Sequence, residues 1–268
     1  MTTEAGLLDT ITVAKPWGKD ILPAPFVAPQ GERIGEIWFD PPASLDDILV
    51  KYLFTSEKLS VQVHPSDAQA PPGSRGKEEC WLVLDAEPGA SLAIGFREPI
   101  DAGAMRAAAI DGSIEQLLEW HPVQRGDFFY LPAGTVHAIG AGVTILEIQQ
   151  NSDITYRLFD YGRPRELHLD EGIAVARGEP YGSEHHRHFA LGTAATLVDG
   201  RFFTVRLCVG NLDSAAGFEP APLLVLPLEG QPTVAGQRVS PGECGLAPNL
   251  AAVTLGSGDR VVLVQPRS

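Results

Sequence analysis

Short stretches in which apolar and polar residues alternate are spread along the chain. The clearest lies at residues 59–64, where apolar positions alternate with the polar residues Ser60, Gln62 and His64. Because successive side chains of a strand point to opposite faces, these three polar groups would share one face. Runs of this kind, or of mostly apolar residues, predict strands at residues 48–54, 59–64, 80–84, 127–131, 143–149, 202–209, 223–228, 251–255 and 260–264.

Two helical segments interrupt these strands. Ser113 begins a Ser-x-x-Gln capping box, and apolar residues then recur at helical spacing over residues 114–118. Asp170 is predicted to open a second helix, over about residues 170–176. The 28 glycines and 22 prolines favour many turns and short strands over long helices. We therefore predict an all-β fold with a few short helices, built as a sandwich or a closed barrel.

A weak internal repeat indicates two similar units. The segment VQRGDFFYLP at residues 123–132 is echoed by VSPGECGLAP at residues 239–248, and five residues after the final proline stand His137 and Val253, respectively. Either the Gly/Pro-rich turns match by coincidence, or the chain holds two barrels of one kind, of which only the first keeps polar chemistry. The second interpretation gives an N-terminal catalytic domain with helical insertions at residues 1–182, and a smaller C-terminal β-barrel domain without metal at residues 183–268.

The charge balance excludes some classes of partner. With 34 Asp and Glu against 20 Lys and Arg, the net charge is −14, which argues against a nucleic acid or an anionic membrane as partner. The apolar stretch at residues 128–146 contains Pro132, His137 and glycines, so it predicts two strands and a turn and not a membrane span. The three widely spaced cysteines and the lack of a signal-peptide pattern predict a cytoplasmic protein.

Polar side chains also fall on one face of two further predicted strands. Alternation groups Lys77 and Glu79 with Trp81, and it groups Glu147 with Gln149. For any single strand, a solvent-exposed polar face explains such a pattern. Several such strands in one barrel instead favour an interior lined with polar groups.

Two short motifs predict a metal site. His137 closes Gly-x5-Pro-x-Gly-x2-His at residues 126–137, which resembles the second motif of the cupin superfamily, where this histidine binds metal inside a jelly-roll barrel. Gln62-x-His64 resembles the start of the first cupin motif with its first histidine replaced, and the expected glutamate is delayed to Glu79. Two imidazoles and a carboxylate leave metal positions open for water or substrate, and Gln62 can add a carbonyl oxygen.

Four longer segments resemble the type I mannose-6-phosphate isomerases, and most closely their shorter bacterial branch: LSVQVHP at residues 59–65, GKEECW at 76–81, GDFFYLPAGTVHAI at 126–139 and LEIQQNSDITYR at 146–157. The similarity extends over about residues 17–171. This resemblance implies two cupin-type jelly-roll barrels, the first metal-binding and the second degenerate. It also implies one divalent metal per chain, expected to be Zn²⁺, held by His64, Glu79 and His137, with Gln62 as a ligand in some members.

The same resemblance assigns further site residues by position. Arg157 falls on the family's catalytic arginine, Lys51 on a lysine implicated in proton transfer, and Lys77 on another active-site lysine. Trp17 begins a segment that resembles the family's Trp-Gly-Gly, which lines the substrate pocket, although Lys19 replaces the second glycine. The implied activity is interconversion of D-mannose 6-phosphate and D-fructose 6-phosphate through an enediol intermediate, so the expected partner is a small sugar phosphate.

This chemistry requires a base that moves a proton between two adjacent carbons. A lysine serves only if burial or nearby positive charge lowers its pKa. Lys51, expected near the metal and Arg157, is the first candidate, and Glu147 and Lys77 are the next. Lys77 and Arg157 are also the cations expected to bind the phosphate, with Ser60 as a hydrogen-bond donor to the substrate.

Two other functions fit parts of the pattern. A non-catalytic cupin that binds a sugar phosphate, as a sensor or a partner subunit, would keep the polar cavity without a proton shuttle. The joint presence of Lys51, Arg157 and three metal ligands argues against it. An iron-dependent cupin oxygenase would need an open metal position for dioxygen but no group that binds phosphate.

Overall fold

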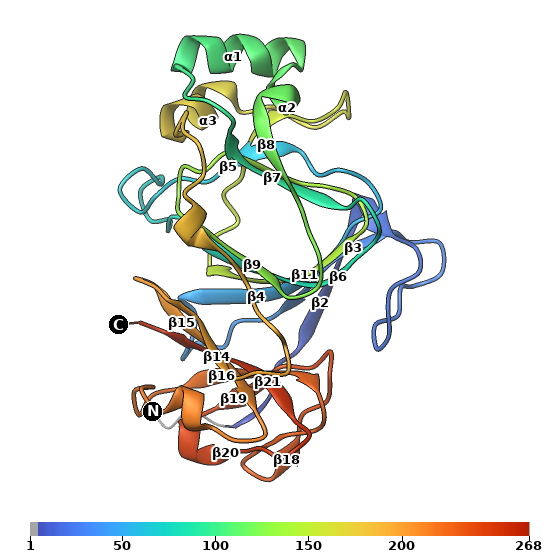
Figure 1. Cartoon of the computed structure of the whole chain (residues 1–268), viewed down its shortest axis with the longest axis vertical. Coiled ribbons are helices and arrows are strands. Elements are labelled where there is room, and N and C mark those ends of the chain that lie inside the picture. The colour runs from blue at the N-terminus through green and yellow to red at the C-terminus, as the bar shows by residue number, and fades with distance from the viewer. Residues whose placement is uncertain (1–4, 268) are drawn as a thin grey trace.

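The computed structural model describes residues 5–267, whose strands form four sheets stacked in layers beneath a cap of short helices (Figure 1). Successive layers contain five, seven, six and three strands. The predicted all-β fold with a few short helices is confirmed. Each pair of sheets packs face to face as in a jelly roll, and among the described residues no sheet closes on itself through hydrogen bonds.

The first two sheets form the upper lobe of Figure 1. The five-stranded sheet has the order β12 (Tyr156–Phe159), β5 (Val61–Val63), β10 (His137–Ile139), β7 (Ser91–Phe96) and β8 (Leu118–Pro122). The seven-stranded sheet has the order β13 (His186–His188), β9 (Asp127–Leu131), β6 (Glu79–Ala86), β11 (Val143–Gln150), β4 (Ile48–Phe54), β3 (Ile34–Phe39) and β2 (Thr10–Lys19).

The other two sheets form the lower lobe. The six-stranded sheet has the order β1 (Gly6–Leu7), β19 (Gly245–Ala247), β16 (Leu223–Glu229), β21 (Arg260–Pro266), β15 (Phe203–Val209) and β14 (Ala195–Asp199). The three-stranded sheet has the order β18 (Gln237–Arg238), β17 (Thr233–Val234) and β20 (Val253–Thr254). Helices complete the fold: α1 (Ala102–Asp111), α2 (Ile114–Leu117), α3 (Leu169–Val175) and the 3₁₀ turns η1 (Ser183–His185), η2 (Asp213–Ala215) and η3 (Leu250–Ala252).

The seven-stranded sheet is buried on both faces, and this position decides where its polar residues lie. On β11, Leu146 and Ile148 pack in the core shared with the six-stranded sheet, whereas Ile145 packs toward the five-stranded sheet. Glu147, which alternates with Leu146 and Ile148, therefore points to the interior of the upper lobe, and its residue is only 2% exposed. The polar strand faces could have been exposed to solvent or could have lined the interior. The structure supports an interior lined with polar groups.

One hydrophobic core joins the two lobes. Leu146 and Phe54 of the seven-stranded sheet pack with Val205, Leu226 and Val262 of the six-stranded sheet. Burying each such side chain contributes about 1.5–3 kcal/mol. A second core lies between α1, α3 and the outer face of the five-stranded sheet. The site strands are thus held between packed layers on both sides.

Two short strands cross the proposed domain boundary between residues 182 and 183. β1 pairs with β19 of the lower lobe, and β13 pairs with β9 of the upper lobe. The two repeat segments take related shapes, because Gly126 and Gly242 both adopt positive φ, at 94° and 89°, ahead of β9 and β19. In the second copy, Val253 lies on β20 in an apolar core.

Helix and strand ends differ from the sequence predictions at several points. The capping box at Ser113 was wrong, because Ser113 has helical backbone angles and makes no capping bond, and α2 ends at Leu117. The capping residue is Asp101, whose side chain accepts a hydrogen bond from the Ala104 N–H at the start of α1. Helix α3 begins at Leu169 and not at Asp170. Of the strand predicted at 251–255, residues 250–252 form a 3₁₀ turn. None of the described helices has the length and apolar character needed to cross a bilayer.

Candidate active site

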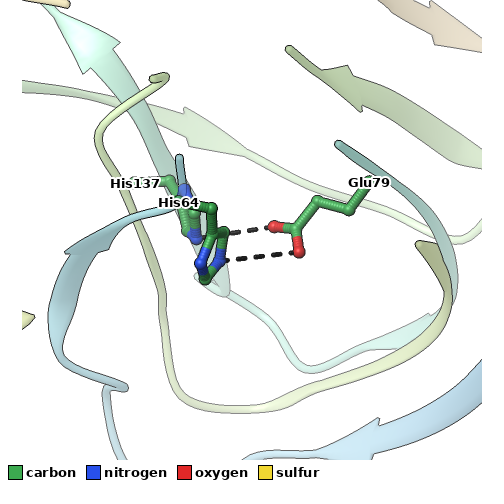
Figure 2. Close-up of side chains that lie close together, drawn as sticks. All are labelled: His64, Glu79 and His137. Atoms are coloured by element: carbon green, nitrogen blue, oxygen red, sulfur yellow. Dashed lines mark ion pairs between the residues drawn. The ribbon is translucent and has the colours of Figure 1, made fainter. Parts of the chain in front are cut away.

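Three side chains from separate strands meet inside the upper lobe. His64 follows β5, Glu79 begins β6 and His137 begins β10. The Nε2 atoms of His64 and His137 lie 3.6 and 3.5 Å from the two carboxylate oxygens of Glu79 (Figure 2). One ligand atom from each residue lies within 4.8 Å of the others, and all three side chains are buried. The three residues that the sequence motifs predicted as ligands are therefore brought together as a possible metal-binding group.

Backbone carbonyls orient both imidazoles toward Glu79. The Nδ1 atom of His64 lies 2.8 Å from the Ile154 carbonyl oxygen, and Nδ1 of His137 lies 2.9 Å from the Thr135 carbonyl oxygen. Because a carbonyl oxygen only accepts hydrogen bonds, each Nδ1 carries the proton. Each neutral ring then presents the Nε2 lone pair to the centre of the group, which is the arrangement that metal-ligating histidines use.

The electrostatics favour the ligand form of all three groups. Burial lowers the pKa of His64 well below its usual value, with further lowering by Lys77 and His137, and burial also lowers the pKa of His137. Burial alone would raise the pKa of Glu79, but Lys77 and His137 outweigh it and lower that pKa to about 2. The site thus holds two neutral imidazoles and one carboxylate at neutral pH. The buried Oε1 of Glu79 has no hydrogen-bond partner among residues 5–267, which fits a bound cation.

Gln62 lies directly beside this triad, opposite His137 in the pairing of β5 and β10. Its amide nitrogen is 3.2 Å from His137 Nε2, and its amide oxygen accepts a hydrogen bond from Ser60 Oγ at 3.0 Å. The amide oxygen that the sequence offered as a fourth ligand is therefore turned toward Ser60. On the other side, Gln62 is paired with Arg157 of β12.

Lys77 contacts the triad itself. Its Nζ donates a hydrogen bond to Glu79 Oε2 at 2.6 Å and lies 3.0 Å from His64 Nε2. The residue is 4% exposed. Its ammonium group therefore contacts the triad, and Lys77 also lines the cavity that Arg157 lines, so its use to bind the substrate phosphate stays a prediction.

A second buried pair, Lys51 and Glu147, lines a cavity beside the triad, and Lys77 and Gln62 lie on the wall of that cavity. Lys51 Nζ lies 2.8 Å from Glu147 Oε2, and Trp81 Nε1 donates to Glu147 Oε1 at 3.0 Å. Burial would lower the pKa of Lys51, but the carboxylates of Glu147 and Glu36 outweigh it and raise that pKa above its usual value. The lowered lysine pKa that the sequence analysis expected is thus wrong for this structure, since Lys51 stays protonated at neutral pH.

Arginines lie at another part of the cavity wall. Arg157 lines the cavity together with Arg165 and Lys15. Burial lowers the pKa of Arg157, and the nearby Arg165 lowers it further. Asp160 accepts two hydrogen bonds of 2.6 Å from Arg165. The buried Nε of Arg157 has no partner among the described residues.

The remaining predicted residues line the same cavity, and three residues were missed. Trp17, 3% exposed, and Ser60 both lie on its wall. Sequence reasoning did not find Lys15, Glu36 or Arg165. Glu36 was detectable as the single carboxylate in the apolar run IGEIWF of β3, where its residue is buried.

Comparisons with known proteins show which family the chain is similar to. No protein-family profile matches the chain. Over 180 residues it is 41% identical to a mannose-6-phosphate isomerase of Streptococcus mutans, covering 63% of this chain and 57% of that protein. Over 213 residues it is 36% identical to the mannose-6-phosphate isomerase ManA of Bacillus subtilis, covering 74% of this chain and 67% of that protein. The chain belongs to the mannose-6-phosphate isomerase family. It spans between about half and two thirds of the length of the curated family members that it matches.

Solved structures of the family show the same fold. The crystal structure of the mannose 6-phosphate isomerase from Bacillus subtilis superimposes with a TM-score of 0.79 at 23% identity, covering 98% of this chain and 100% of that one. A putative mannosephosphate isomerase from Archaeoglobus fulgidus gives a TM-score of 0.75 at 17% identity, covering 100% of both chains. The likeness therefore extends over both lobes of this family member.

Proposed function

We propose that the protein is a metal-dependent aldose–ketose isomerase that interconverts D-mannose 6-phosphate and D-fructose 6-phosphate through an enediol. One observation carries this proposal: the buried Lys51–Glu147 pair lines a cavity directly beside the buried triad, and Lys77 and Gln62 of that cavity's wall contact triad side chains. Membership of the family supports it. A cavity that only bound a sugar phosphate would have no use for a charged pair held out of water.

The triad is the proposed holder of one divalent metal per chain. We favour zinc, because two histidines and a glutamate, with positions left open, form a common catalytic zinc site. When bound, such a metal supplies Lewis-acid stabilisation of the negative charge that develops on the sugar oxygens. His64, Glu79 and His137 would hold it, and the unpartnered Oε1 of Glu79 is the atom of this structure that supports the assignment. Gln62 would be a ligand only after its amide turns.

Glu147 is the proposed general base. Isomerisation of open-chain mannose 6-phosphate moves one proton from C2 to C1 and one from O2 to O1. The Glu147 carboxylate would take the carbon proton at C2 and return it at C1, while Trp81 holds its other oxygen. Protonated Lys51 would donate a proton to O1 and receive the proton that leaves O2. Because its pKa is raised, Lys51 stays protonated, so it cannot take the carbon proton and is instead placed to pass a proton between the two sugar oxygens.

Arg157 is the proposed phosphate ligand. Its guanidinium lines the cavity and has an unpartnered Nε, and a guanidinium can bind phosphate through two hydrogen bonds. Arg165, fixed by Asp160, adds positive charge nearby. Ser60 and Trp17 on the same wall would contact the sugar. Binding the phosphate away from the triad would orient the reacting carbons toward Glu147.

A coupled assay with mannose 6-phosphate tests this function. We expect turnover that a chelator abolishes and that added Zn²⁺ restores better than other single divalent ions. Saturable binding of mannose 6-phosphate without conversion, by protein reloaded with each metal in turn, would instead support a non-catalytic sugar-phosphate-binding protein. Unchanged turnover after complete metal removal would show that the triad does not serve the reaction.

A further inference from the structure

The lower lobe contains a cavity of its own, which the proposed isomerase reaction does not use. It has a volume of about 720 Å³, opens to solvent and is lined by residues of β14, β15 and β21 and by residues 217–221. These strands lie in the lower lobe of Figure 1. On β15, Val205 and Leu207 pack in the core shared with the upper lobe, whereas Cys208 packs on the opposite side. Arg206 alternates with Val205 and Leu207, so it points away from the shared core and lines this cavity.

Arg206 has hydrogen-bonding capacity that the protein does not use. Its Nε and Nη1 atoms are buried, and neither has a hydrogen-bond partner among residues 5–267. The Phe218 ring lies 6.0 Å from the guanidinium carbon. Arginine stays charged in proteins, and two buried guanidinium nitrogens without hydrogen-bond acceptors are unfavourable, although the residue as a whole is half-buried. In the upper lobe, Glu79 Oε1 and Arg157 Nε are also buried without a hydrogen-bond partner, and both belong to the proposed active site.

Several polar side chains of the lower cavity are already paired, whereas the Glu219 carboxylate is exposed. Arg267 donates to Thr204 and forms an ion pair with Asp199. Gln265 accepts from the Glu219 N–H and donates to two backbone carbonyls, so its amide is fully used. The unpaired positive charge in the wall is therefore that of Arg206.

We propose that this cavity binds a small monocarboxylate with a flat or apolar body. The guanidinium fork of Arg206 matches one carboxylate through two parallel hydrogen bonds. A ligand with more negative charge would meet the exposed carboxylate of Glu219 in the same wall. The Phe218 ring and the prolines Pro220 and Pro266 offer apolar surface to the body of the ligand.

Benzoate is a suitable probe, with benzamide as its uncharged counterpart and inorganic phosphate as an anion of higher charge. Isothermal titration calorimetry on the full chain should show saturable binding of benzoate, weaker binding of phosphate and no binding of benzamide. The Arg206→Gln variant should weaken benzoate binding by about tenfold or more, since it loses a charged, two-fold hydrogen bond. If that variant does not fold, the Arg206→Lys variant gives the same test. It keeps the positive charge but cannot form two parallel hydrogen bonds to one carboxylate, so it should also bind benzoate more weakly.

Two matched variants control for other cations. Arg238→Gln removes an exposed arginine of β18, and Arg157→Gln removes the unpartnered arginine of the upper cavity. Both should bind benzoate as the unmodified protein does. Benzoate affinity that is unchanged in both Arg206 variants, or absent from the unmodified protein, would overturn the proposal. Phosphate that binds more tightly than benzoate in an Arg206-dependent way would overturn the monocarboxylate assignment.

Discussion

Lys51 and Glu147 stand directly opposite each other on β4 and β11, with their charged atoms 2.8 Å apart and their side chains 8% and 3% exposed. A buried ion pair of this kind commonly gives less stability than apolar side chains of the same volume. It persists here between two layers of apolar packing, beside the triad that is proposed to hold the metal. Its position is therefore better explained by proton transfer than by stability.

The first prediction concerns this pair. Glu147→Gln should lower kcat for mannose 6-phosphate by about 10²–10⁴-fold, because it removes the proposed base and keeps the shape of the side chain. Exchange of solvent deuterium into C1 and C2 of the substrate should disappear with it. Steady-state kinetics and NMR of the recovered sugar phosphates measure both. The exposed pair of Lys19 with Glu87, also at 2.8 Å, supplies the control, and Glu87→Gln should keep normal kinetics.

A double variant separates chemistry from folding. Glu147→Gln leaves the Lys51 charge buried without its partner, which should destabilise the protein by about 3–5 kcal/mol in urea unfolding. Adding Lys51→Met should restore most of that stability and none of the activity. If the double variant recovers activity together with stability, the pair is structural and the base lies elsewhere.

The second prediction concerns the triad. His137→Ala and Glu79→Ala should each lose bound metal and activity together, since each removes one of the three donors that face one another. Elemental analysis of the purified protein should give one tightly bound divalent ion per chain. His185→Ala, which changes an imidazole outside the triad, should retain both metal and turnover. An active, metal-replete His137→Ala protein, or two tightly bound ions per chain, would contradict the assignment.

The third prediction concerns Arg157 and the phosphate. Free mannose should react far more slowly than mannose 6-phosphate, because binding of the phosphate positions the reacting carbons. Arg157→Ala should keep its metal and lose about 10²–10³-fold in kcat/KM for the phosphorylated sugar. The variant should change kcat/KM for free mannose much less. The ratio of kcat/KM for mannose 6-phosphate to kcat/KM for mannose should therefore fall. An equal loss for both sugars would show that Arg157 acts at the reacting carbons and not on the phosphate.

Much of the fold could be predicted from alternation alone. The limits of β4 and β9 agree with the predicted strands at 48–54 and 127–131, where both faces of the strand are buried. The missed strands include the edge strands β2 and β8 and the interior strands β3 and β7. Most residues of β2 and β8 are at least partly exposed, so neither strand shows a continuous run of apolar residues. The capping box failed because Ser113 follows Gly112, the left-handed residue that ends α1.

The sequence predicted the metal ligands of the site, but it did not predict the protonation state and hydrogen bonds of the lysines beside them. Motif spacing brought His64, Glu79 and His137 together, although they lie on different strands. The protonation of Lys51 depends on Glu147, which stands opposite it on β11, and on Glu36 of the neighbouring strand β3, where Trp38 is the residue paired with Lys51. No local pattern around residue 51 contains that information. Likewise, the hydrogen bond from Lys77 to Glu79 depends on side-chain geometry within the buried cavity.

The final prediction concerns pH and the strand that connects the lobes. His186 of β13 stacks on Phe129 of β9, with ring centroids 4.2 Å apart and an angle of 9° between the rings. Burial lowers the pKa of His186 below the usual 6.5, and the nearby His121 and His188 lower it further against the opposing effect of Asp127. Below pH 6.5 the unfolded chain therefore binds a proton at His186 more readily than the folded protein does.

It follows that this residue contributes stability above pH 6.5 that is lost as the pH falls toward the lower folded-state pKa. His186→Phe keeps an aromatic ring against Phe129 and removes the titration. Urea unfolding across this range should show a smaller loss of stability on acidification in His186→Phe than in the unmodified protein. His185→Gln, which changes an imidazole that does not stack on Phe129, should keep the original pH dependence. If His186→Phe loses stability as steeply as the unmodified protein, docking of β13 is not sensitive to protonation of His186.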